Sequence, residues 1–452
     1  MPSLRLSVFV VCLWACTAGA VQAQADSWSE PQAITAVGEK ISTPVAGLGP
    51  NGYAVVVWSP PVRDMPTGGS SPTQSDVGII VRVRASYGAG FGSPVKIGGP
   101  GSSGANLAVG SRGHTALSWV SRSGKTMAAF RGPSGAWSKP KAISNASFWG
   151  VNLDVGSDGT TVAAGVRLVK GHKSVFAAVR MPGKRKFQAW RRIDLGVPGI
   201  GNYISVAAGK NGRASVAWSG KCPMFDPAGR EPARVAEADG RSGFARSRPV
   251  PGTKCPTSGI QIERDVFGNS YLLVGGSAGT HQTVRLSTKR LKGWFRPSKV
   301  LNRKSVSAVS GILTISRTGV ASVIWTDLSE QPGGAMRPLS VSLSQTTRRS
   351  APTPPVILPV DPSTVYLLGA AALGRSGIQI LWQDLTDFSL VSARFAGGSL
   401  GPSKLVGQPS TTESIAPAQI VSSGSSAMIA WGEASLSGGS ITDLMVADCP
   451  RC

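Results

Sequence analysis

Short apolar runs of strand length return eight times along this chain, and six of them end in tryptophan. The copies span residues 52–58, 113–119, 159–165, 212–218, 268–274, 319–325, 377–382 and 425–431. Turn sequences such as Asn51-Gly52 and Asn211-Gly212 precede or open several runs, which favours two-residue hairpins. The runs recur about every fifty residues, a period typical of propellers and similar arrays. The pattern therefore predicts a repeat protein built of strands.

A second phrase precedes each run and begins with an aromatic or small residue. A proline usually follows three positions later, and an aliphatic residue stands at the sixth position. The copies span residues 28–34, 91–97, 137–143, 187–193, 244–250, 294–300, 351–357 and 399–405. Because proline cannot donate to a ladder, we assign this phrase to the outermost strand, D. Strand A, such as 105–109, precedes the apolar run (strand B), and strand C, such as 81–85, follows it. Four strands per unit is the content of a propeller blade.

The two ends of the chain are complementary. The D phrase at 28–34 has no A–B–C before it, and the last A–B–C has no D after it. The economical solution is that the N-terminal strand completes the last blade, which leaves no open sheet edge. We therefore predict an all-β fold, a single propeller of about eight four-stranded blades over residues 26–452. Seven blades with one irregular unit is the alternative, because the runs ending at Gly165 and Val274 lack the tryptophan. No segment shows helical periodicity over a dozen residues.

The first 25 residues have the features of a signal peptide. Arg5 supplies the positive charge, residues 6–18 the apolar core and residues 23–25 a small-x-small cleavage site. The core is shorter than the roughly 20 residues that a membrane span needs. No later stretch qualifies, so we expect a soluble, secreted or extracellular protein without a transmembrane span. The alternative is a lipid anchor at Cys16, although Trp14 fits the lipoprotein pattern poorly.

The chain without this segment has four cysteines: Cys222, Cys255, Cys449 and Cys452. An even number in an exported protein indicates disulfides. We expect Cys222 to pair with Cys255, because both fall in loops on the same face of consecutive blades. Cys449-Pro-Arg-Cys452 resembles a redox motif, but it has no βαβ pattern around it, so we interpret it as a terminal disulfide staple.

Composition points to the kind of partner. Charged residues make up only 15% of the chain, and the formal net charge is +24. Such a balance attracts anionic surfaces and polymers. Because we expect export, an envelope polyanion, glycan or surface protein is favoured over nucleic acid, and we expect a monomer.

Basic clusters fall on one predicted face of the ring. In a propeller the D–A and B–C connections emerge on one face, here called the top face, and the A–B and C–D turns emerge on the bottom face. Three predicted C–D turns carry the basic residues Lys184, Arg185 and Lys186; Lys289, Arg290 and Lys292; and Arg348 and Arg349. Three clusters on one face predict a polyanion-binding surface.

The predicted top face carries candidate aromatic ligands. Phe148 and Trp149 fall in a D–A loop, and Tyr203 and Phe225 fall in loops of the next unit. Exposed aromatic rings can stack on a sugar or grip a peptide. The alternative is that these loops fold their aromatics back onto the ring.

Candidate catalytic acids also fall on the top face. Asp327, Asp384 and Glu433 each stand two residues after a strand-B tryptophan. Converging carboxylates could form an acid/base pair or bind a cation, and glycosidases need two carboxyls about 5–9.5 Å apart. The alternative is three solvated loop residues. The three histidines lie in different units, and phosphate loops and nucleophile elbows are missing, so we expect no metal and no cofactor.

With this repeat pattern the chain resembles secreted bacterial β-propeller proteins, some of them sialidase-like, across the whole mature length. The sialidase Asp box, Ser-x-Asp-x-Gly-x-Thr-Trp, is absent, and its nearest string, Ser157-Asp158-Gly159, has the wrong spacing. The resemblance implies an architecture and no activity. We expect a non-enzymatic recognition or scaffold propeller that binds an anionic polymer, glycan or protein at the cell envelope. The alternatives are a carbohydrate-active hydrolase or lyase working from the top face, and a structural surface protein without a specific ligand.

Overall fold

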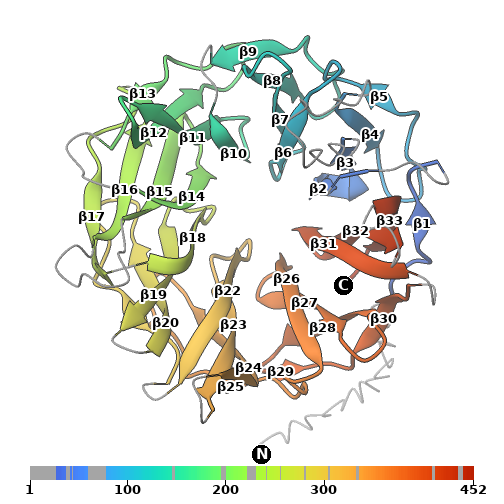
Figure 1. Ribbon diagram of the computed structural model, residues 1–452, viewed down its shortest axis with the longest axis vertical. Coiled ribbons are helices and arrows are strands. Elements are labelled where there is room, and N and C mark those ends of the chain that lie inside the picture. The colour runs from blue at the N-terminus through green and yellow to red at the C-terminus, as the bar shows by residue number, and fades with distance from the viewer. Residues whose placement is uncertain are drawn as a thin grey trace, which may run out of the picture.

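The computed structural model describes residues 27–36, 41–42, 44–59, 78–144, 148–194, 200–220, 231–240, 242–254, 256–278, 281–303, 306–331, 335–409, 413–435 and 441–452. They form eight antiparallel sheets arranged as the blades of a closed ring (Figure 1). The prediction of an eight-bladed, all-β propeller is confirmed, and the seven-bladed alternative is wrong. The predicted signal peptide lies outside the described residues. No helix in the described ranges is long and apolar enough to cross a membrane.

Seven sheets have one strand in each of four positions, and the sheet of blade 7 has a fifth strand. Blades are numbered here by the order of their inner strands. The inner strands (A) are β2 (Val45–Leu48), β6 (Ser103–Val109), β10 (Trp149–Val155), β14 (Ile200–Ala208), β18 (Pro256–Arg264), β22 (Ser307–Ile315), β26 (Val365–Leu373) and β31 (Glu413–Ser423). The B strands are β3 (Ala54–Trp58), β7 (Thr115–Val120), β11 (Thr161–Val169), β15 (Arg213–Gly220), β19 (Ser270–Ala278), β23 (Ala321–Glu330), β27 (Gly377–Asp384) and β32 (Ser426–Ser435). The C strands are β4 (Ile80–Arg84), β8 (Thr126–Arg131), β12 (His172–Arg180), β16 (Pro232–Asp239), β20 (His281–Lys289), β24 (Met336–Thr346), β28 (Leu390–Ala396) and β33 (Ile441–Cys449). The outer strands (D) are β5 (Val95–Lys96), β9 (Lys141–Ser144), β13 (Arg191–Arg192), β17 (Arg248–Lys254), β21 (Lys299–Val300), β25 (Val356–Ile357), β30 (Lys404–Gly407) and, for blade 8, β1 (Gln32–Ala33). The fifth strand of blade 7 is β29 (Ser399–Leu400), which pairs with β28 as β30 does.

The B strands are buried on both sides because every blade packs face to face against two neighbours. All five residues of β3 are buried, from Ala54 to Trp58. Trp58, Trp218, Trp325 and Trp431 are among the largest fully buried side chains. A strand covered on both faces needs a continuous apolar sequence rather than an alternating one, which explains why the repeat is legible.

In most blades the outer strand is shorter than the predicted D phrase, and the exception is β17, which has seven residues. In blade 2 the phrase covers 137–143, but β9 begins only at Lys141. The aromatic end of the phrase keeps one isolated bridge, Arg131↔Trp137, and blade 4 has the same arrangement at Ala238↔Phe244. Six phrases have their proline just before the outer strand begins, whereas Pro249 lies within β17, opposite Arg234.

The N-terminal strand closes the ring, as predicted. Gln32 pairs with Val446 and Ala33 with Met445, so β1 lies against β33 (Figure 1). The Ile34 amide extends the pairing by donating to Leu444 O over 2.7 Å.

The A–B and C–D turns lie together on the bottom face. In blade 1 the Tyr87 amide of the C–D turn donates to Asn51 O of the A–B turn. Most A–B turns are longer than the predicted two-residue hairpins: the Gly110 amide donates to His114 O, and the Gly113 amide donates to Gly110 O. This is a three-residue loop in which Gly113 takes a positive φ of 83°. A two-residue turn is found in blade 8, where Ser423 pairs with Ser426.

Polar side chains join neighbouring inner strands around the central axis. The carboxylate of Asp154 accepts from the Ala208 amide over 2.7 Å, and Gln261 Oε1 accepts from the Leu313 amide over 2.7 Å. Gln419 Oε1 likewise accepts from the Ala46 amide over 2.9 Å, across the closure between blades 8 and 1. These bonds satisfy inner-edge N–H groups that no ladder reaches.

Candidate functional site

A pocket of about 510 Å³ lies on the ring axis at the bottom face. The inner-strand ends and A–B turns of all eight blades line it, from Leu48 in blade 1 to Gly424 in blade 8. Its volume lies within the roughly 300–1,000 Å³ of small-molecule sites. We call it the axial pocket.

The two halves of the axial pocket differ in charge. Blades 3 to 6 contribute the ionisable residues Asp154, Lys210, Arg213, Glu263, Arg264, Asp265 and Arg317. Blades 7, 8, 1 and 2 contribute only small or neutral residues: Ala372, Gly374, Ser422, Ser423, Gly424, Leu48, Val109, Gly110 and Ser111. A ligand in this pocket would therefore meet charge on one side and an uncharged wall on the other.

Two carboxyl groups of the charged half differ in their hydrogen bonds. Asp154 accepts from the amides of Val155 and Ala208, both over 2.7 Å. Glu263 is exposed to the pocket. Its confinement inside the ring, with the negative charge of Asp154 adding to it, raises the pKa of Glu263 to about 8. Glu263 is therefore largely a neutral acid at pH 7 and can donate a hydrogen bond.

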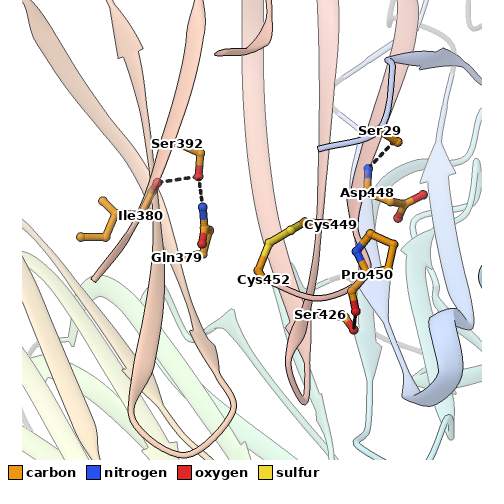
Figure 2. The surroundings of a disulfide bond; sticks show 9 residues. All are labelled: Ser29, Gln379, Ile380, Ser392, Ser426, Asp448, Cys449, Pro450 and Cys452. Atoms are coloured by element: carbon orange, nitrogen blue, oxygen red, sulfur yellow. Dashed lines mark hydrogen bonds between the residues drawn. A yellow bond between two sulfur atoms is a disulfide. The ribbon is translucent and has the colours of Figure 1, made fainter. Parts of the chain in front are cut away.

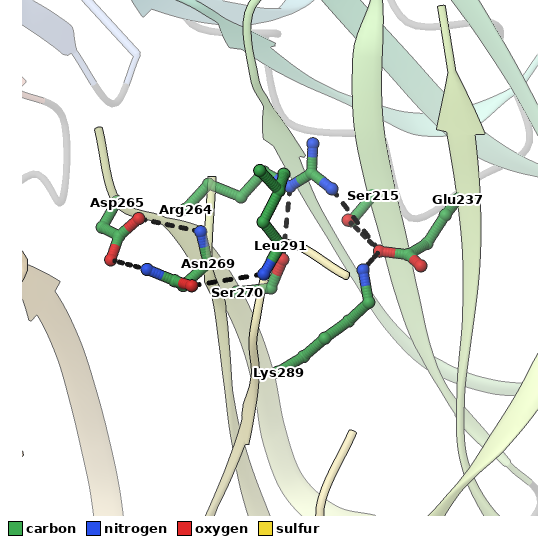
Figure 3. A network of polar contacts seen from close by, with 8 residues as sticks. All are labelled: Ser215, Glu237, Arg264, Asp265, Asn269, Ser270, Lys289 and Leu291. Carbon is green, nitrogen blue, oxygen red and sulfur yellow. Dashed lines mark hydrogen bonds and ion pairs between the residues drawn. The ribbon is translucent and has the colours of Figure 1, made fainter. Parts of the chain in front are cut away.

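A buried ion network lies behind the axial pocket, between blades 4 and 5 (Figure 3). Glu237 Oε1 accepts from Lys289 Nζ over 2.7 Å, from Arg264 Nη2 over 3.4 Å and from Ser215 Oγ over 3.3 Å. Lys289 and Arg264 side chains are only 5% and 6% exposed. The assignment of Lys289 to the polyanion-binding surface is therefore wrong, because this cation is neutralised inside the ring.

The position of Lys289 recurs in other blades. Lys289 and Arg84 are the last residues of their C strands, and each pairs with an acid near the end of the preceding blade's C strand: Lys289 with Glu237, and Arg84 with Asp448. Arg180 ends the C strand of blade 3 and lies 4.2 Å from the ring centroid of Phe130 in blade 2. A cation that ends strand C thus lies in a blade interface. Alignment of the repeats would have predicted this position for Lys289.

The cations that follow strand C are different, because they lie in exposed turns. We call them the rim cations: Lys184, Arg185, Lys186, Arg290, Lys292, Arg348 and Arg349, all exposed. Buried Arg180 holds the first of these turns in place, since its guanidinium donates to Lys184 O over 2.7 Å and to Gly159 O over 2.9 Å. Arg348 lies over the Phe267 ring, 5.0 Å from its centroid.

Acids in the described bottom-face turns are few and already bonded. Asp158 accepts from the Thr160 and Asn211 amides, and Asp265 accepts from the Phe267 and Asn269 amides. Asp239, which ends β16, accepts from the Ser242 amide over 2.9 Å. The rim cations therefore stand on a face whose carboxylates serve its own turns.

On the top face, the candidate acids have local structural partners. Asp327 is 4% exposed and accepts from Trp325 Nε1 over 2.8 Å, Ser340 Oγ over 3.0 Å and Ser342 Oγ over 2.5 Å. Asp384 accepts from the Thr386 amide and hydroxyl within its own turn. Glu433 accepts from Trp431 Nε1 over 3.4 Å.

The spacing that drew attention to these acids has a structural origin. Residues i and i+2 of a strand point to the same side, so an acid two positions after tryptophan can accept from its indole. Convergence of Asp327, Asp384 and Glu433 on one cleft stays a prediction, but Asp327 is turned into its own blade. In blade 4 the equivalent residue is Gly220, and the buried Trp218 indole N–H has no hydrogen-bond partner in the described part of the chain.

The candidate aromatic residues do not share one environment. Phe148 is 2% exposed and stacks on Trp190 with ring centroids 4.5 Å apart, so it lies in the core rather than in a surface loop. Tyr203, in β14, is 42% exposed and lines a second pocket of about 320 Å³ with Asn152 and Gln261. Trp149 begins β10; its side chain, like the whole of Phe225, lies outside what the structure describes.

The C-terminal cysteines are joined and buried. Cys449 and Cys452 form a disulfide with Cα atoms 5.5 Å apart (Figure 2). Ser426 Oγ donates to Pro450 O over 2.6 Å and ties this short loop to β32. Cys222 and Cys255 lie outside the described residues, so their pairing stays a prediction. Within the described ranges no cluster of three His, Cys, Asp or Glu side chains could hold a metal ion.

Comparisons with known proteins find similar solved structures but no related sequence. Neither a protein-family model nor a curated protein matches the sequence. Among solved structures, the polysaccharide lyase Uly1 is 8% identical, with a TM-score of 0.49 over 94% of this chain and 99% of its own. A protein of unknown function from Dyadobacter fermentans is 11% identical, with a TM-score of 0.43 and coverage of 94% and 99%. An α-L-arabinanase from Penicillium chrysogenum is 12% identical, with a TM-score of 0.37 and coverage of 64% and 89%. Such similarity concerns the fold alone.

Proposed function

We propose that this protein is a non-enzymatic recognition propeller that binds an anionic polymer across its bottom face. The observation that carries the proposal is the division of basic residues on that face. Lys289 and Arg84 are buried and paired between blades, whereas the rim cations are exposed and the nearby acids serve their own turns.

Exposed cations lie both in the rim and at the axial pocket. Lys210, Arg213 and Arg317 are exposed at the pocket, inside the circle of C–D turns that holds the rim cations. Unpaired cations around a concave site focus the potential and raise the local concentration of anions. A flexible polyanion can contact several such positions at once and release its condensed counterions.

The alternative of a top-face glycosidase has weaker support. Asp327 is engaged by three donors in its own blade, and a catalytic carboxyl must instead reach a substrate. We also propose that the protein is exported, on the strength of the signal-like first 25 residues. An anionic polymer of the cell envelope is then the natural class of partner.

The test is binding of the purified chain to polygalacturonate, heparin and polyphosphate, with uncharged dextran as the control. A rim variant replaces Lys184, Arg185, Lys186, Arg348 and Arg349 by serine. We expect the native protein to bind at least one polyanion and not dextran, and the rim variant to bind it at least tenfold more weakly, since the loss of about 1.4 kcal/mol is tenfold. Equal affinity of the two proteins, or binding of dextran as tight as that of the polyanions, would contradict the proposal.

A further inference from the structure

Two of the three arginines that line the axial pocket, Arg213 and Arg317, make no ion pair with the described residues. Arg213 opens β15 and Arg317 lies in the A–B turn of blade 6, and both side chains are exposed. Among the described residues, neither guanidinium lies within ion-pair distance of a carboxylate. Each of these unpaired guanidiniums lines a concave site and is suited to bidentate binding of an oxyanion.

Arg317 also extends along the pocket wall. A Cβ atom added to Gly424 would lie 3.3 Å from Arg317 Cζ, although Gly424 belongs to blade 8 and Arg317 to blade 6. The guanidinium therefore lies against the A–B turn of blade 8, where it covers part of the otherwise neutral wall of the pocket.

A third cation, Arg264, lies at the wall of the axial pocket beside Gly209. A Cβ atom added to Gly209 would lie 2.8 Å from Arg264 Nη1, so this glycine permits the guanidinium to approach the backbone of blade 4. Nε and Nη2 of Arg264 are engaged by Ser270 and Glu237. The Arg264 guanidinium is thus held in position by its hydrogen bonds to Ser270 and Glu237.

We propose that the axial pocket binds a single anionic group carried on a compact uncharged body, as one acidic unit of the polymer would present it, with Arg213 and Arg317 holding the anion. The neutral half, built from small residues of blades 7, 8, 1 and 2, receives the uncharged body. This inference rests on the proposed function and deepens it. The rim cations attract the anionic polymer, and the axial pocket selects which acidic unit of the polymer is bound.

Glu263 makes the site sensitive to protonation. The charged groups around it are Asp154 on β10, Lys210 and Arg213 from the A–B turn of blade 4, Arg264 and Asp265 beside it, and Arg317 of blade 6. Confinement and the charge of Asp154 raise the pKa of Glu263 to about 8, so below pH 8 its protonated carboxyl can donate to the anion. Above pH 8 the carboxylate repels the anion and affinity falls.

The probes are a galacturonic acid trimer, the neutral galactose trimer, and inorganic sulfate and phosphate, each titrated calorimetrically against the full chain. We expect the acidic trimer to bind, the neutral trimer not to bind, and the inorganic ions to bind more weakly because they lack the uncharged body. Arg213→Gln with Arg317→Gln should weaken the acidic trimer by roughly tenfold per arginine, the size of one charge-assisted hydrogen bond.

Matched controls separate the pocket from general charge. Arg112 and Arg375 are exposed arginines of the A–B turns of blades 2 and 7, and neither lines the pocket. Arg112→Gln with Arg375→Gln should leave trimer affinity within about twofold, because it removes the same charge without removing a ligand contact. Glu263→Gln should abolish the decline in affinity between pH 7 and pH 9.

The outcomes of the two proposals are distinguishable. Polymer binding that responds to the rim variant, with no acidic trimer bound, would overturn the pocket and leave the proposed function standing. Inorganic ions that bind as tightly as the trimer would overturn the role of the uncharged body. Equal losses in the Arg213/Arg317 and Arg112/Arg375 variants would overturn the pocket as the anion site.

Discussion

The bottom and top faces of the ring come from the same repeat, yet their ionisable residues serve different purposes. At the end of strand B, on the top face, Asp327 and Glu433 accept from the indole of the tryptophan two residues earlier. After the end of strand C, on the bottom face, Lys184, Arg290 and Arg348 are exposed. Asp327 and Glu433 thus bind tryptophan side chains of their own blades, whereas these bottom-face cations lie outside the packed blades.

The boundary between these uses can be drawn within two residues. Lys289 is buried and paired with Glu237, while the next residue, Arg290, is exposed. Successive residues of a strand point to opposite sides, and the chain leaves the sheet just here. A basic cluster in the sequence can therefore contain both buried, ion-paired cations and exposed cations that can bind a partner. The end of the strand separates the two kinds.

The largest expected effect tests the structural side of this boundary. Glu237→Gln should lower the free energy of unfolding by about 3–5 kcal/mol, because it leaves Arg264 and Lys289 buried without a counter-charge. Asp239→Asn, on the same strand but exposed, should cost less than about 1 kcal/mol. Urea denaturation of both variants measures the difference, and equal losses would show that the network is not buried as described.

A second comparison concerns the top-face acids. Asp327→Ala should lower the free energy of unfolding by about 2–4 kcal/mol, because two buried donors and one half-buried donor lose their acceptor. Asp384→Ala removes only two hydrogen bonds within an exposed turn and should cost less than about 1 kcal/mol. Thermal unfolding monitored by near-UV circular dichroism measures both, and an Asp327→Ala variant as stable as Asp384→Ala would return Asp327 to the list of candidate functional acids.

The two buried tryptophans give a smaller and cleaner contrast. Trp325 and Trp218 are both fully buried, but the Trp325 indole donates to Asp327 while the Trp218 indole has no partner among the described residues. Trp325→Phe should therefore be more destabilising than Trp218→Phe by about 1–3 kcal/mol, since only the former leaves a buried carboxylate short of a donor. The Asp327→Ala background should remove most of that difference in chemical denaturation, and a persistent difference would assign it to packing.

A further expected effect is a pH dependence of stability. The pKa of Glu263 is raised from 4.5 in the unfolded chain to about 8 in the ring, so the folded state binds the extra proton between these values. Its contribution to stability is fully present below pH 4.5 and is lost as the pH rises through 8. Glu263→Gln should flatten the decline in melting temperature between pH 6 and pH 9, whereas a decline as steep as in the native protein would assign it to other groups.

The architecture could be predicted from the sequence because each B strand is buried on both faces and is therefore a continuous apolar run. The 50-residue spacing and the unmatched D phrase were sufficient to predict eight blades and the pairing of β1 with β33. Outer strands and turns were less accurate. In most blades proline stands before the outer strand begins, and a turn sequence such as Asn51-Gly52 does not distinguish a two-residue loop from the three-residue loop that blade 1 has.

The candidate site was only partly accessible from sequence. The exposed rim cations follow from the C–D turns, but Arg213, Glu263 and Arg317 stand in different repeats and meet only because the ring brings inner-strand ends to one axis. Aligning the repeats by their turns would have shown that Lys289 is equivalent to Arg84 and so lies in a blade interface. Phe148 could not be placed, because its burial depends on Trp190 and Phe176 across the blade.

The most direct test of the central claim compares removal of equal charge from the two faces. The rim variant is matched by a top-face variant in which Arg122, Lys125, Lys170, Arg303 and Arg337, all exposed, are replaced by serine. Both lose five positive charges, and the measurement is the slope of log affinity against log salt for the polyanion that binds the native protein. The account predicts a markedly flatter slope and weaker binding for the rim variant alone, because fewer counterions are released where the polymer lies. Equal slopes for the two variants would show that net charge, and not the bottom face, governs binding.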